Sequence, residues 1–154
     1  MAEIKRILLA TDFSECSNHA REFACQIASQ FKAELHLLYV IHDMAVEVPD
    51  FGMGLAFPGY LENVTGVKRE LSMKAHEKLE AELSEPWVEQ LQVVHSVRFG
   101  IPATKIVEYA QEHEIDLIVI GTHGRVGIPH VLLGSVAERV IKHAPCPVTT
   151  VRLP

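Results

Sequence analysis

The fold is decided by one stretch of the chain, Asp116-Leu117-Ile118-Val119-Ile120-Gly121-Thr122-His123-Gly124, followed after nine residues by Gly134-Ser135-Val136-Ala137-Glu138-Arg139-Val140-Ile141-Lys142-His143. It begins with an apolar run of strand type and ends with apolar residues at helical spacing. A glycine-rich loop between a buried strand and a helix start offers backbone N–H groups and the positive end of a helix dipole, which suits a phosphate. The spacing matches neither the dinucleotide fingerprint nor the P-loop. On these residues alone, the stretch is either a phosphate-binding loop or a plain turn.

Outward from this stretch, strand-type runs alternate with helical patterns, which predicts a parallel sheet with helices on both faces. The expected strands cover residues 7–11, 35–41, 92–98, 117–120 and 148–151, and the third alternates like a half-covered edge strand. Ser14 suits the N-cap of the first helix, Pro102 suits the first turn of the third, and the fourth covers residues 135–143. We therefore predict one domain over residues 1–154, with an α/β, doubly wound, Rossmann-like fold of five parallel strands and four helices.

Two of the expected helices have a clear apolar face. In the first helix this face comprises Ala20, Phe23, Ala24, Ile27, Ala28 and Phe31. In the second, a long helix ended by Pro86, it comprises Val67, Leu71, Ala75, Leu79 and Leu83. Residues 43–59, before the second helix, are rich in Gly, Pro and large apolar side chains without a helical or strand period. Such a long loop is usually functional or mobile. This segment either covers the ligand crevice as a lid, contacts a partner, or packs on its own domain.

The composition is that of an ordinary globular protein, with 154 residues of which 48% are hydrophobic and 22% charged. A net charge of −6 argues against a general nucleic-acid binder, because affinity for the phosphate backbone rests on Lys and Arg. No apolar run approaches the ~18 residues of a membrane-spanning helix, and no signal peptide is evident, so we expect a cytoplasmic protein. Cys16, Cys25 and Cys146 lack metal-ligand pairing and are expected to be free thiols. Cys16 is either redox-active or an incidental small residue.

The pattern Gly-x-x-Gly, nine residues, Gly-Ser resembles the nucleotide-binding signature of the universal stress protein family. Three further segments resemble this family in order and spacing. They are Ile7-Leu8-Leu9-Ala10-Thr11-Asp12-Phe13-Ser14, Gly100-Ile101-Pro102-Ala103 and Ala144-Pro145-Cys146-Pro147-Val148. Together they cover nearly the whole chain. Because the glycine signature is intact, the chain resembles the ATP-binding branch of the family.

The resemblance implies the strand order 3-2-1-4-5, so that Asp12 and Gly121 end adjacent strands at the switch point, where doubly wound sheets bind ligands. It also implies a role for each matched position. Ala10 and Thr11 lie below the adenine and ribose, and Asp12 hydrogen-bonds the ribose or helps to order Mg²⁺ near the phosphates. The backbone of Val40 meets the adenine edge. The other positions wrap the ribose and phosphates or offer N–H groups to them: Gly121, Thr122, His123, Gly124, Gly134, Ser135, Val136 and Ala137.

Some of these residues have a second interpretation. Arg125, inside the glycine loop, either pairs with a terminal phosphate or is a solvated surface arginine. Asp12 either contacts the ligand or only caps the following helix. His123 is either a catalytic base or a hydrogen-bonding group for ribose or phosphate. Its sequence neighbours include neither a nucleophile nor an orienting carboxylate, which favours the hydrogen bond. The nine histidines form no His-Glu-x-x-His pattern, so a dedicated zinc site is not expected.

Three functions are consistent with these features. The first is an ATP-binding regulatory protein of the stress response, which holds ATP (or AMP or ADP) with Mg²⁺ and turns it over slowly or not at all. The second is an enzyme of the ATP pyrophosphatase type, although such enzymes carry Ser-Gly-Gly where this chain has Thr11-Asp12-Phe13-Ser14. The third is a stress-response scaffold that binds no nucleotide. The last strand, Val148–Val151, has strong β propensity and is expected at a sheet edge, through which family members commonly form homodimers.

Overall fold

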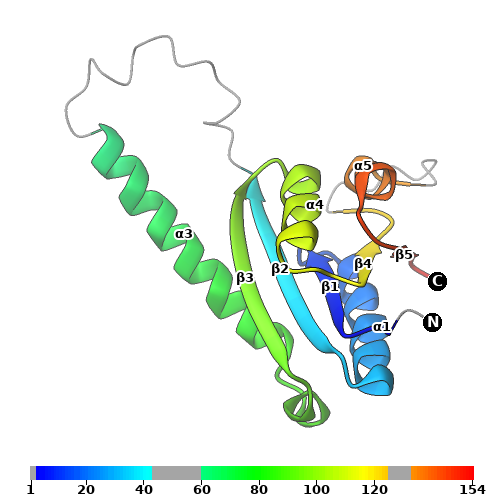
Figure 1. Ribbon diagram of the computed structural model, residues 1–154. Coiled ribbons are helices and arrows are strands. Elements are labelled where there is room, and N and C mark those ends of the chain that lie inside the picture. The colour runs from blue at the N-terminus through cyan, green and yellow to red at the C-terminus, as the bar shows by residue number, and fades with distance from the viewer. Residues whose placement is uncertain (1–2, 43–59, 125–132) are drawn as a thin grey trace.

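Within the described residues, five parallel strands form one sheet in the order β3-β2-β1-β4-β5 (Figure 1). The computed structural model describes residues 3–42, 60–124 and 133–154. The strands are β1 (Arg6–Thr11), β2 (Glu34–His42), β3 (Val93–Gly100), β4 (Leu117–Gly121) and β5 (Val148–Val151). Ile7 of β1 is paired with Leu35 of β2 and with Leu117 of β4, so β1 lies at the centre. The predicted five-stranded sheet and its order are confirmed.

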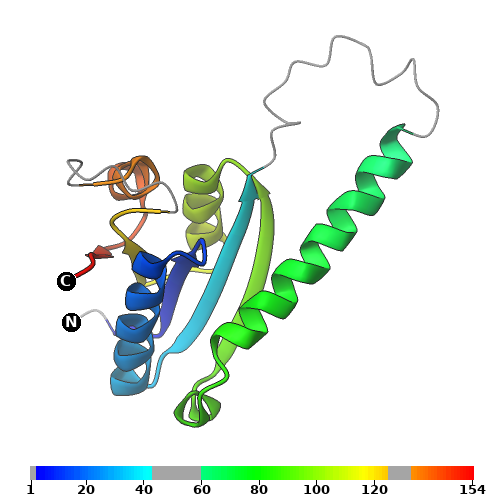
Figure 2. The ribbon, with the colours of Figure 1, turned by 180° about the vertical axis from the view of Figure 1, so that it is seen from behind.

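Helices cover both faces of the sheet (Figures 1 and 2). One face carries α1 (Glu15–Phe31) and α3 (Tyr60–Glu82), and the other carries α4 (Pro102–Glu112) and α5 (Ser135–His143). Successive side chains of a strand point to opposite faces. Leu8 of β1 therefore joins the core under α4 and α5, while Ile7 and Leu9 join the core under α1 and α3. Because both faces of the sheet are buried, the central strands consist of nearly continuous runs of apolar residues.

Local signals explain where two of these helices begin. Ser14 has an extended backbone, and its Oγ accepts a hydrogen bond from the N–H of Ser17 at 3.2 Å, which is the predicted N-cap of α1. Pro102 occupies the first turn of α4, where its missing N–H leaves no hydrogen bond unmade. The predicted bounds of α5 and of β5 agree with the structure.

The apolar face predicted for α3 is only half buried. Ala75 and Leu79 are buried, but Val67 is 57% exposed and Leu71 is 43% exposed. Figures 1 and 2 show the reason, because the N-terminal half of α3 diverges from the sheet while its C-terminal half lies beside it. The predicted helix is confirmed, but the exposure of Val67 and Leu71 shows that the N-terminal part of its apolar face is not buried. Residue spacing identifies a shared helix face but not how much of that face meets the sheet.

Two smaller expectations also differ from the structure. Phe31, in the last turn of α1, is 51% exposed rather than inward, because the chain turns away there at Lys32. α3 ends at Glu82, and Pro86 instead begins a short 3-10 helix, Pro86–Gln90. Residues 43–59, expected as a long irregular loop, lie outside the described residues. In the part of the chain that is described, no helix is long and apolar enough to cross a lipid bilayer.

The three cysteines are free thiols, as expected. Cys16 and Cys25 are buried, and burial raises the pKa of Cys25 to about 11. Its reactive thiolate is therefore scarce near neutral pH. The Sγ of Cys16 donates to the carbonyl of Val151 at 3.2 Å and packs closely between elements. This environment favours a structural role for Cys16 over a redox role.

Candidate functional site

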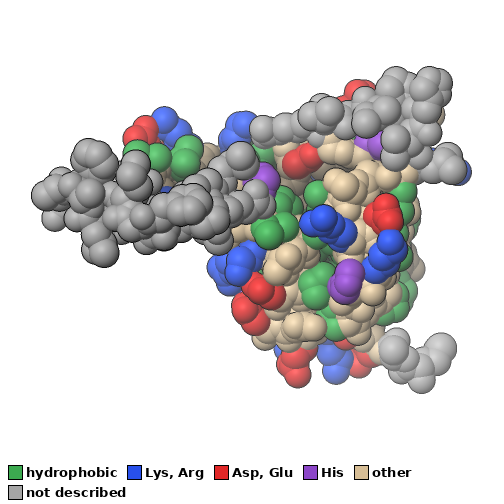
Figure 3. Space-filling view, turned by 90° about the horizontal axis from the view of Figure 1, so that it is seen from above, with side chains coloured by type: hydrophobic (Ala, Val, Ile, Leu, Met, Phe, Trp, Pro, Cys, Tyr) green, Lys and Arg blue, Asp and Glu red, His purple; other side chains and the backbone are tan. Residues whose placement is uncertain are grey.

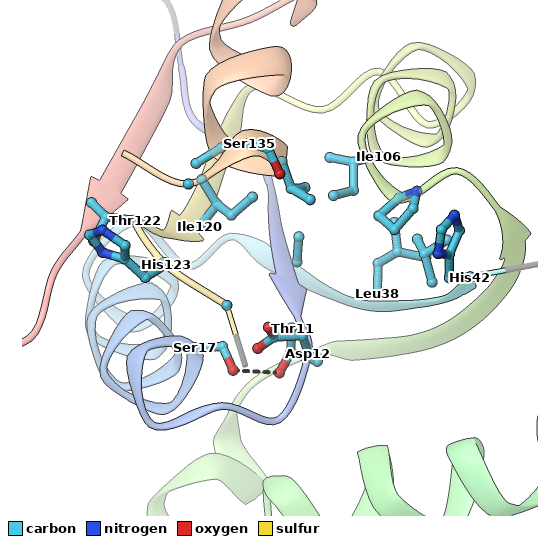
Figure 4. A pocket seen from close by; sticks show the side chains of 18 residues that line it. Thr11, Asp12, Ser17, Leu38, His42, Ile106, Ile120, Thr122, His123 and Ser135 are labelled. Atoms are coloured by element: carbon cyan, nitrogen blue, oxygen red, sulfur yellow. Dashed lines mark hydrogen bonds between the residues drawn. The ribbon is translucent and has the colours of Figure 1, made fainter. Parts of the chain in front are cut away.

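A cavity of about 440 Å³ lies at the carboxyl ends of β1, β2 and β4 (Figure 4). Its other walls come from the first turn of α1, from α4 and from the start of α5. β1 and β4 are the adjacent strands at which the winding of the sheet reverses. Ligands of doubly wound sheets bind at this point, outside the carboxyl ends of the strands.

The loop after β1 is held by its own side chains. The Oδ1 of Asp12 accepts from the N–H of Ser14 at 3.0 Å, and the Oγ1 of Thr11 accepts from the N–H of Phe13 at 3.1 Å. Phe13 has a φ of 63°, and its ring packs against Tyr39 with the centroids 4.7 Å apart, on the face of α1 and α3. Asp12 lines the cavity. The Oδ1 of Asp12 thus holds the loop after β1, and the N-cap of α1 is Ser14 rather than Asp12. Contact of Asp12 with a ligand stays a prediction.

The first turn of α1 supplies a second hydroxyl at the same place. The hydroxyls of Thr11 and Ser17 hydrogen-bond at 3.1 Å, as Figure 4 shows, and the Oγ of Ser17 also donates to the carbonyl of Ser14 at 2.9 Å. Both residues are buried, with 7% and 3% of their surface exposed. Their mutual bonds fix the start of α1 against the end of β1, and so fix the floor of the cavity.

The glycine signature brings two loops into closer contact than any other residue allows. A Cβ on Gly124 would lie 2.6 Å from the Oδ2 of Asp12, and a Cβ on Gly134 would lie 2.8 Å from the carbonyl oxygen of Thr122. Real Cβ atoms essentially never approach so closely. Gly124 therefore lets the loop after β4 approach the carboxylate that follows β1, and Gly134 lets the start of α5 approach the loop after β4.

Thr122 holds several parts of the site together. Its N–H donates to the carbonyl of Val151 in β5 at 2.8 Å, and its own carbonyl accepts from the N–H of Gly134. Its Oγ1 lies 3.0 Å from the Nδ1 of His123, so the two side chains are hydrogen-bonded. Thr122 is only 4% exposed. It thus connects the edge strand, the start of α5 and one wall of the cavity.

The start of α5 presents main-chain donors to the cavity. Gly134 is its N-cap and has no side chain to accept from the first turn. The first N–H groups of a helix have no carbonyl partner within the helix, so Ser135, Val136 and Ala137 offer theirs at the positive end of the helix dipole. All three residues line the cavity. This end of the cavity is therefore suited to an anion.

The structure brings twelve of the thirteen sequence-predicted site residues around this one cavity, and their role towards a ligand stays a prediction. The twelve are Ala10, Thr11, Asp12, Val40, Gly121, Thr122, His123, Gly124, Gly134, Ser135, Val136 and Ala137. The thirteenth, Arg125, lies outside the described residues. Six further lining residues were not predicted: Ser17, Leu38, His42, Pro102, Ile106 and Ile120.

For two of these six residues, the sequence contained a signal that could have identified them. Leu38 and His42 flank Val40 at a spacing of two, so they share its face of β2. Pro102 and Ile106 come from α4. Their position depends on how α4 lies over the sheet, which spacing alone does not reveal. Figure 4 shows Leu38, His42 and Ile106 towards one side of the cavity and Thr122 and His123 towards the other.

In the described part of the chain, the cavity has few side chains that could act as metal ligands. Among the residues that the structure describes, no group of three or more His, Cys, Asp and Glu side chains is placed to hold a metal ion. Asp12 supplies a carboxylate, a hard oxygen ligand of the kind that Mg²⁺ prefers. Mg²⁺ commonly takes one or two carboxylates and completes its shell with water and substrate phosphates. Asp12 therefore fits Mg²⁺ that arrives with a polyphosphate.

The surface around the cavity carries both signs of charge. Figure 3 looks onto the molecule from above and shows basic, acidic and histidine side chains interspersed between the grey segments. On this visible, described surface, the groups best suited to an anion are therefore the main-chain N–H groups at the start of α5.

The fold and the cavity define a doubly wound α/β protein with a crevice at its switch point. Residues 3–152 match the model of the universal stress protein family, and the chain belongs to this family. It is 39% identical over 150 residues to Universal stress protein MJ0531 from Methanocaldococcus jannaschii, an alignment that covers 97% of this chain and 83% of that protein.

Solved structures agree with this assignment. The structure of protein MJ0577 from the same archaeon has a TM-score of 0.78 and 30% sequence identity, and the match covers 99% of each chain. A universal stress protein from Archaeoglobus fulgidus in complex with dAMP has a TM-score of 0.58 at 20% identity, covering 97% of this chain and 99% of that one. At that identity, the second likeness shows the shared fold alone.

Proposed function

We propose that this chain is an ATP-binding regulatory protein, which holds ATP with Mg²⁺ in the cavity and turns it over slowly or not at all. The observation that carries the proposal is the meeting of three features. These are the first-turn N–H groups of α5, the close approach of Gly134 to Thr122, and the close approach of Gly124 to the Asp12 carboxylate. Main-chain N–H groups and a cation held by one carboxylate together offset negative charge on a ligand. Such a site suits a polyphosphate better than a neutral ligand.

The two sides of the cavity suit the two ends of a nucleotide. Leu38, Val40, Pro102 and Ile106 make one side apolar, which suits a planar base. Ser135 and its neighbours at the start of α5 suit the phosphates. The ribose then lies between them, within reach of Asp12 at the end of β1.

Asp12 makes binding depend on a cation. A carboxylate beside a phosphate chain is repelled by it, and the repulsion is stronger in a partly buried site than in water. Mg²⁺ would neutralise the phosphate charge, and the carboxylate of Asp12 would help to hold it there. The residues of this chain hold and orient the nucleotide. The Oδ1 of Asp12 stays bonded to Ser14, which fixes the direction of the carboxylate.

Slow turnover follows from the groups nearest the phosphates. Rapid hydrolysis needs a residue that orients or activates water in line with the γ-phosphate. Asp12 is tied to Ser14, and His123 is hydrogen-bonded to Thr122 by its Nδ1. Both side chains are thus used to hold loops. The A. fulgidus universal stress protein, which shares this fold, was solved in complex with dAMP.

We test the proposal with a thermal-shift panel of ATP, AMP, NAD and flavin, with and without Mg²⁺. ATP at a hundredfold excess over Kd stabilises the protein by about 2.7 kcal/mol, which raises Tm by about 5–10 °C for a chain of this size. Gly134→Ala should remove most of this shift, because its Cβ displaces the carbonyl of Thr122. Gly66→Ala is the matched control, since a Cβ there meets nothing within 4 Å.

Other results of these measurements would indicate another function or another binding site. A folded protein that no adenine nucleotide stabilises at millimolar concentration contradicts the proposal and favours the scaffold. Release of AMP and pyrophosphate in equal amounts with an acceptor favours the pyrophosphatase-type enzyme. A shift that Gly134→Ala leaves intact, with Gly66→Ala behaving identically, places the ligand somewhere other than this cavity.

We also propose that two copies of the chain pair through β5. β5 lies at the edge of the sheet and is paired with β4 along Val148–Val151. The carbonyl oxygens of Pro147 and Val151 accept hydrogen bonds from the N–H groups of Ile118 and Thr122. The carbonyl groups of Pro147 and Val151 therefore point towards β4. By the alternation of a strand, the N–H and C=O groups of Val148 and Thr150 point outward. An outward row of this kind is a ready site for a second strand.

A further inference from the structure

Two buried hydroxyl groups lie side by side in the floor of the cavity. Thr11 ends β1 and Ser17 lies in the first turn of α1. Both side chains line the cavity, although only 7% and 3% of these residues is exposed. Asp12 lies beside them, as Figure 4 shows. This floor is therefore a polar part of the cavity, and it lies apart from the apolar side made by Leu38 and Ile106.

The main chain fixes the direction of the hydrogen bonds in this floor. The Oγ of Ser17 lies 2.9 Å from the carbonyl oxygen of Ser14, which can only accept, so the Ser17 proton points there. The Oγ of Ser17 must then accept from the Oγ1 of Thr11, 3.1 Å away. The Oγ1 of Thr11 in turn accepts from the N–H of Phe13 at 3.1 Å. Both hydroxyl protons are therefore used inside the protein.

What these hydroxyls still offer to a ligand is acceptor capacity. A hydroxyl oxygen has two lone pairs, and Thr11 and Ser17 each use one of them within the protein. The carboxylate of Asp12 has no proton to donate and is likewise an acceptor. A ligand group that lies on this floor therefore has to be a hydrogen-bond donor.

The start of α5 has the opposite character. The first N–H groups of this helix, at Ser135, Val136 and Ala137, are donors, and all three residues line the cavity. Figure 4 shows Ser135 across the cavity from Thr11 and Ser17. Phosphate oxygens are acceptors, so they match the N–H groups of α5 and are mismatched with the floor. A ligand with phosphates at one end and hydroxyls further along is therefore held in one orientation only.

We propose that Ser17 and Thr11, with Asp12, select a ribose whose 2′- and 3′-hydroxyls are both unmodified. This inference rests on the proposed function, and it names the class of nucleotide that the cavity takes, a 5′-phosphorylated ribonucleoside. The two sugar hydroxyls donate to the oxygens of the floor. A deoxy sugar leaves one of these buried acceptors without a partner, which costs free energy. A phosphate on the 3′ oxygen sets acceptor against acceptor and brings its charge against the Asp12 carboxylate.

The first test uses the wild-type protein and needs no variant. Adenosine 3′,5′-bisphosphate is AMP with one further phosphate, on the 3′ oxygen. Calorimetry should give it a Kd at least about tenfold above that of AMP, the equivalent of losing one hydrogen bond to a charged group. A 3′ phosphate that lies in solvent would leave Kd unchanged. Equal or tighter binding of the 3′,5′-bisphosphate overturns the proposal.

Deoxy analogues test the two sugar hydroxyls one at a time. With Mg²⁺ present, 2′-deoxy-ATP and 3′-deoxy-ATP should each bind about fivefold more weakly than ATP, because each lacks one donor to the floor. The base and the phosphates are the same in all three nucleotides, so the ratio of the Kd values reports on the sugar alone. Kd values for both analogues within twofold of that for ATP overturn the proposal.

Ser17→Ala separates a contact with the sugar from a purely structural role. The alanine removes one acceptor, so the preference for ATP over at least one of the two deoxy analogues should fall about fivefold, to near one. Ser29→Ala is the matched control, because Ser29 is an exposed serine near the other end of the same helix, and it should keep the wild-type preference. An equal loss of affinity for all three nucleotides in Ser17→Ala contradicts the role of Ser17. If this variant does not fold, the wild-type series alone decides.

The same titrations distinguish this inference from the proposed function. If the wild-type protein binds none of these nucleotides, the proposed function fails and the selection of a ribose fails with it. If ATP binds, but the deoxy analogues and the 3′,5′-bisphosphate bind as tightly as ATP and AMP, only the selection of the ribose is contradicted.

Discussion

Gly124 and Asp12 show at the scale of single residues how a missing side chain creates a site. The Oδ2 of Asp12 occupies the space that a Cβ on residue 124 needs, at 2.6 Å. The other oxygen, Oδ1, is held by the N–H of Ser14 at 3.0 Å, so the carboxylate has little freedom to turn away. The orientation of one acidic group thus depends on a glycine that lies far from it in sequence.

Gly124→Ala should therefore weaken the part of nucleotide binding that depends on Mg²⁺. The added methyl displaces the carboxylate that meets the cation, and the loss of such an orienting contact costs about tenfold in affinity. Calorimetric titration with ATP, in Mg²⁺ and in EDTA, measures the effect. The loss should be confined to the Mg²⁺ titration, with Gly66→Ala unchanged in both. An equal loss with and without Mg²⁺ contradicts a role of Asp12 in holding the cation.

At the scale of the elements, α3 combines a buried half and an exposed half on one apolar face. Leu79 is fully buried against the sheet, whereas Leu71, two turns nearer the N-terminus, is 43% exposed. The same helix face therefore contributes unequally to stability along its length. Arg21 of α1 donates to the carbonyl of Glu82 and pairs with its carboxylate at 2.8 Å, which ties the C-terminal end of α3 to its neighbour.

Paired alanine substitutions test this division. Leu79→Ala should lower the free energy of unfolding by about 2–5 kcal/mol, because it removes a buried side chain and leaves a cavity. Leu71→Ala should lower it by less than about 1 kcal/mol, since the side chain is half exposed already. Urea unfolding monitored by circular dichroism measures both. Equal losses from the two substitutions would show that the N-terminal half of α3 also packs on the sheet in solution.

The elements also show which features a sequence reveals. The bounds of α5 and β5 agree with prediction because apolar spacing and helix caps are local properties. The position of Asp12 and Gly121 around one cavity was predictable because neighbouring parallel strands end at the same edge of the sheet. The position of Ile106 in the cavity wall and the exposure of Val67 were not predictable. Both depend on how a helix lies over the sheet, which is set by packing between distant segments.

At the scale of the whole molecule, one residue of the cavity wall, Thr122, is hydrogen-bonded to the edge strand of the sheet. Thr122 bonds through its N–H to Val151 in β5 and through its carbonyl to Gly134 at the start of α5. The proposed nucleotide site and the proposed pairing edge are thus neighbours in the structure. They still use different groups, because the outward main-chain groups of β5 belong to Val148 and Thr150.

Thr150→Pro should break the homodimer and leave the monomer folded. Proline removes an outward N–H and is tolerated on an edge strand where no ladder bond is lost. Size-exclusion chromatography with light scattering measures the mass, which should halve relative to the wild type. Thr149→Pro is the control, since its N–H points towards β4 and its loss destabilises the fold. A wild-type protein that is monomeric at high concentration contradicts the proposed pairing.

The stability of the molecule should decrease at acidic pH. Burial lowers the pKa of both His36 and His95, so the folded state binds fewer protons than the unfolded state. The free energy of unfolding is then fully retained above the unfolded pKa of about 6.5 and falls as the pH drops below it. Urea midpoints between pH 8 and 5 measure this fall. The double variant His36→Gln/His95→Gln should have a flatter profile, and an unchanged slope would contradict the assignment to these two residues.

The central claim is that main-chain N–H groups at the start of α5 hold the phosphates of an adenine nucleotide. The most direct measurement is a ¹H–¹⁵N titration of the labelled protein with Mg²⁺–ATP. The amide signals of Ser135, Val136 and Ala137 should shift and saturate at one nucleotide per chain, together with that of Gly124. Saturating shifts confined to residues elsewhere in the molecule, or no shifts at millimolar nucleotide, would contradict the account.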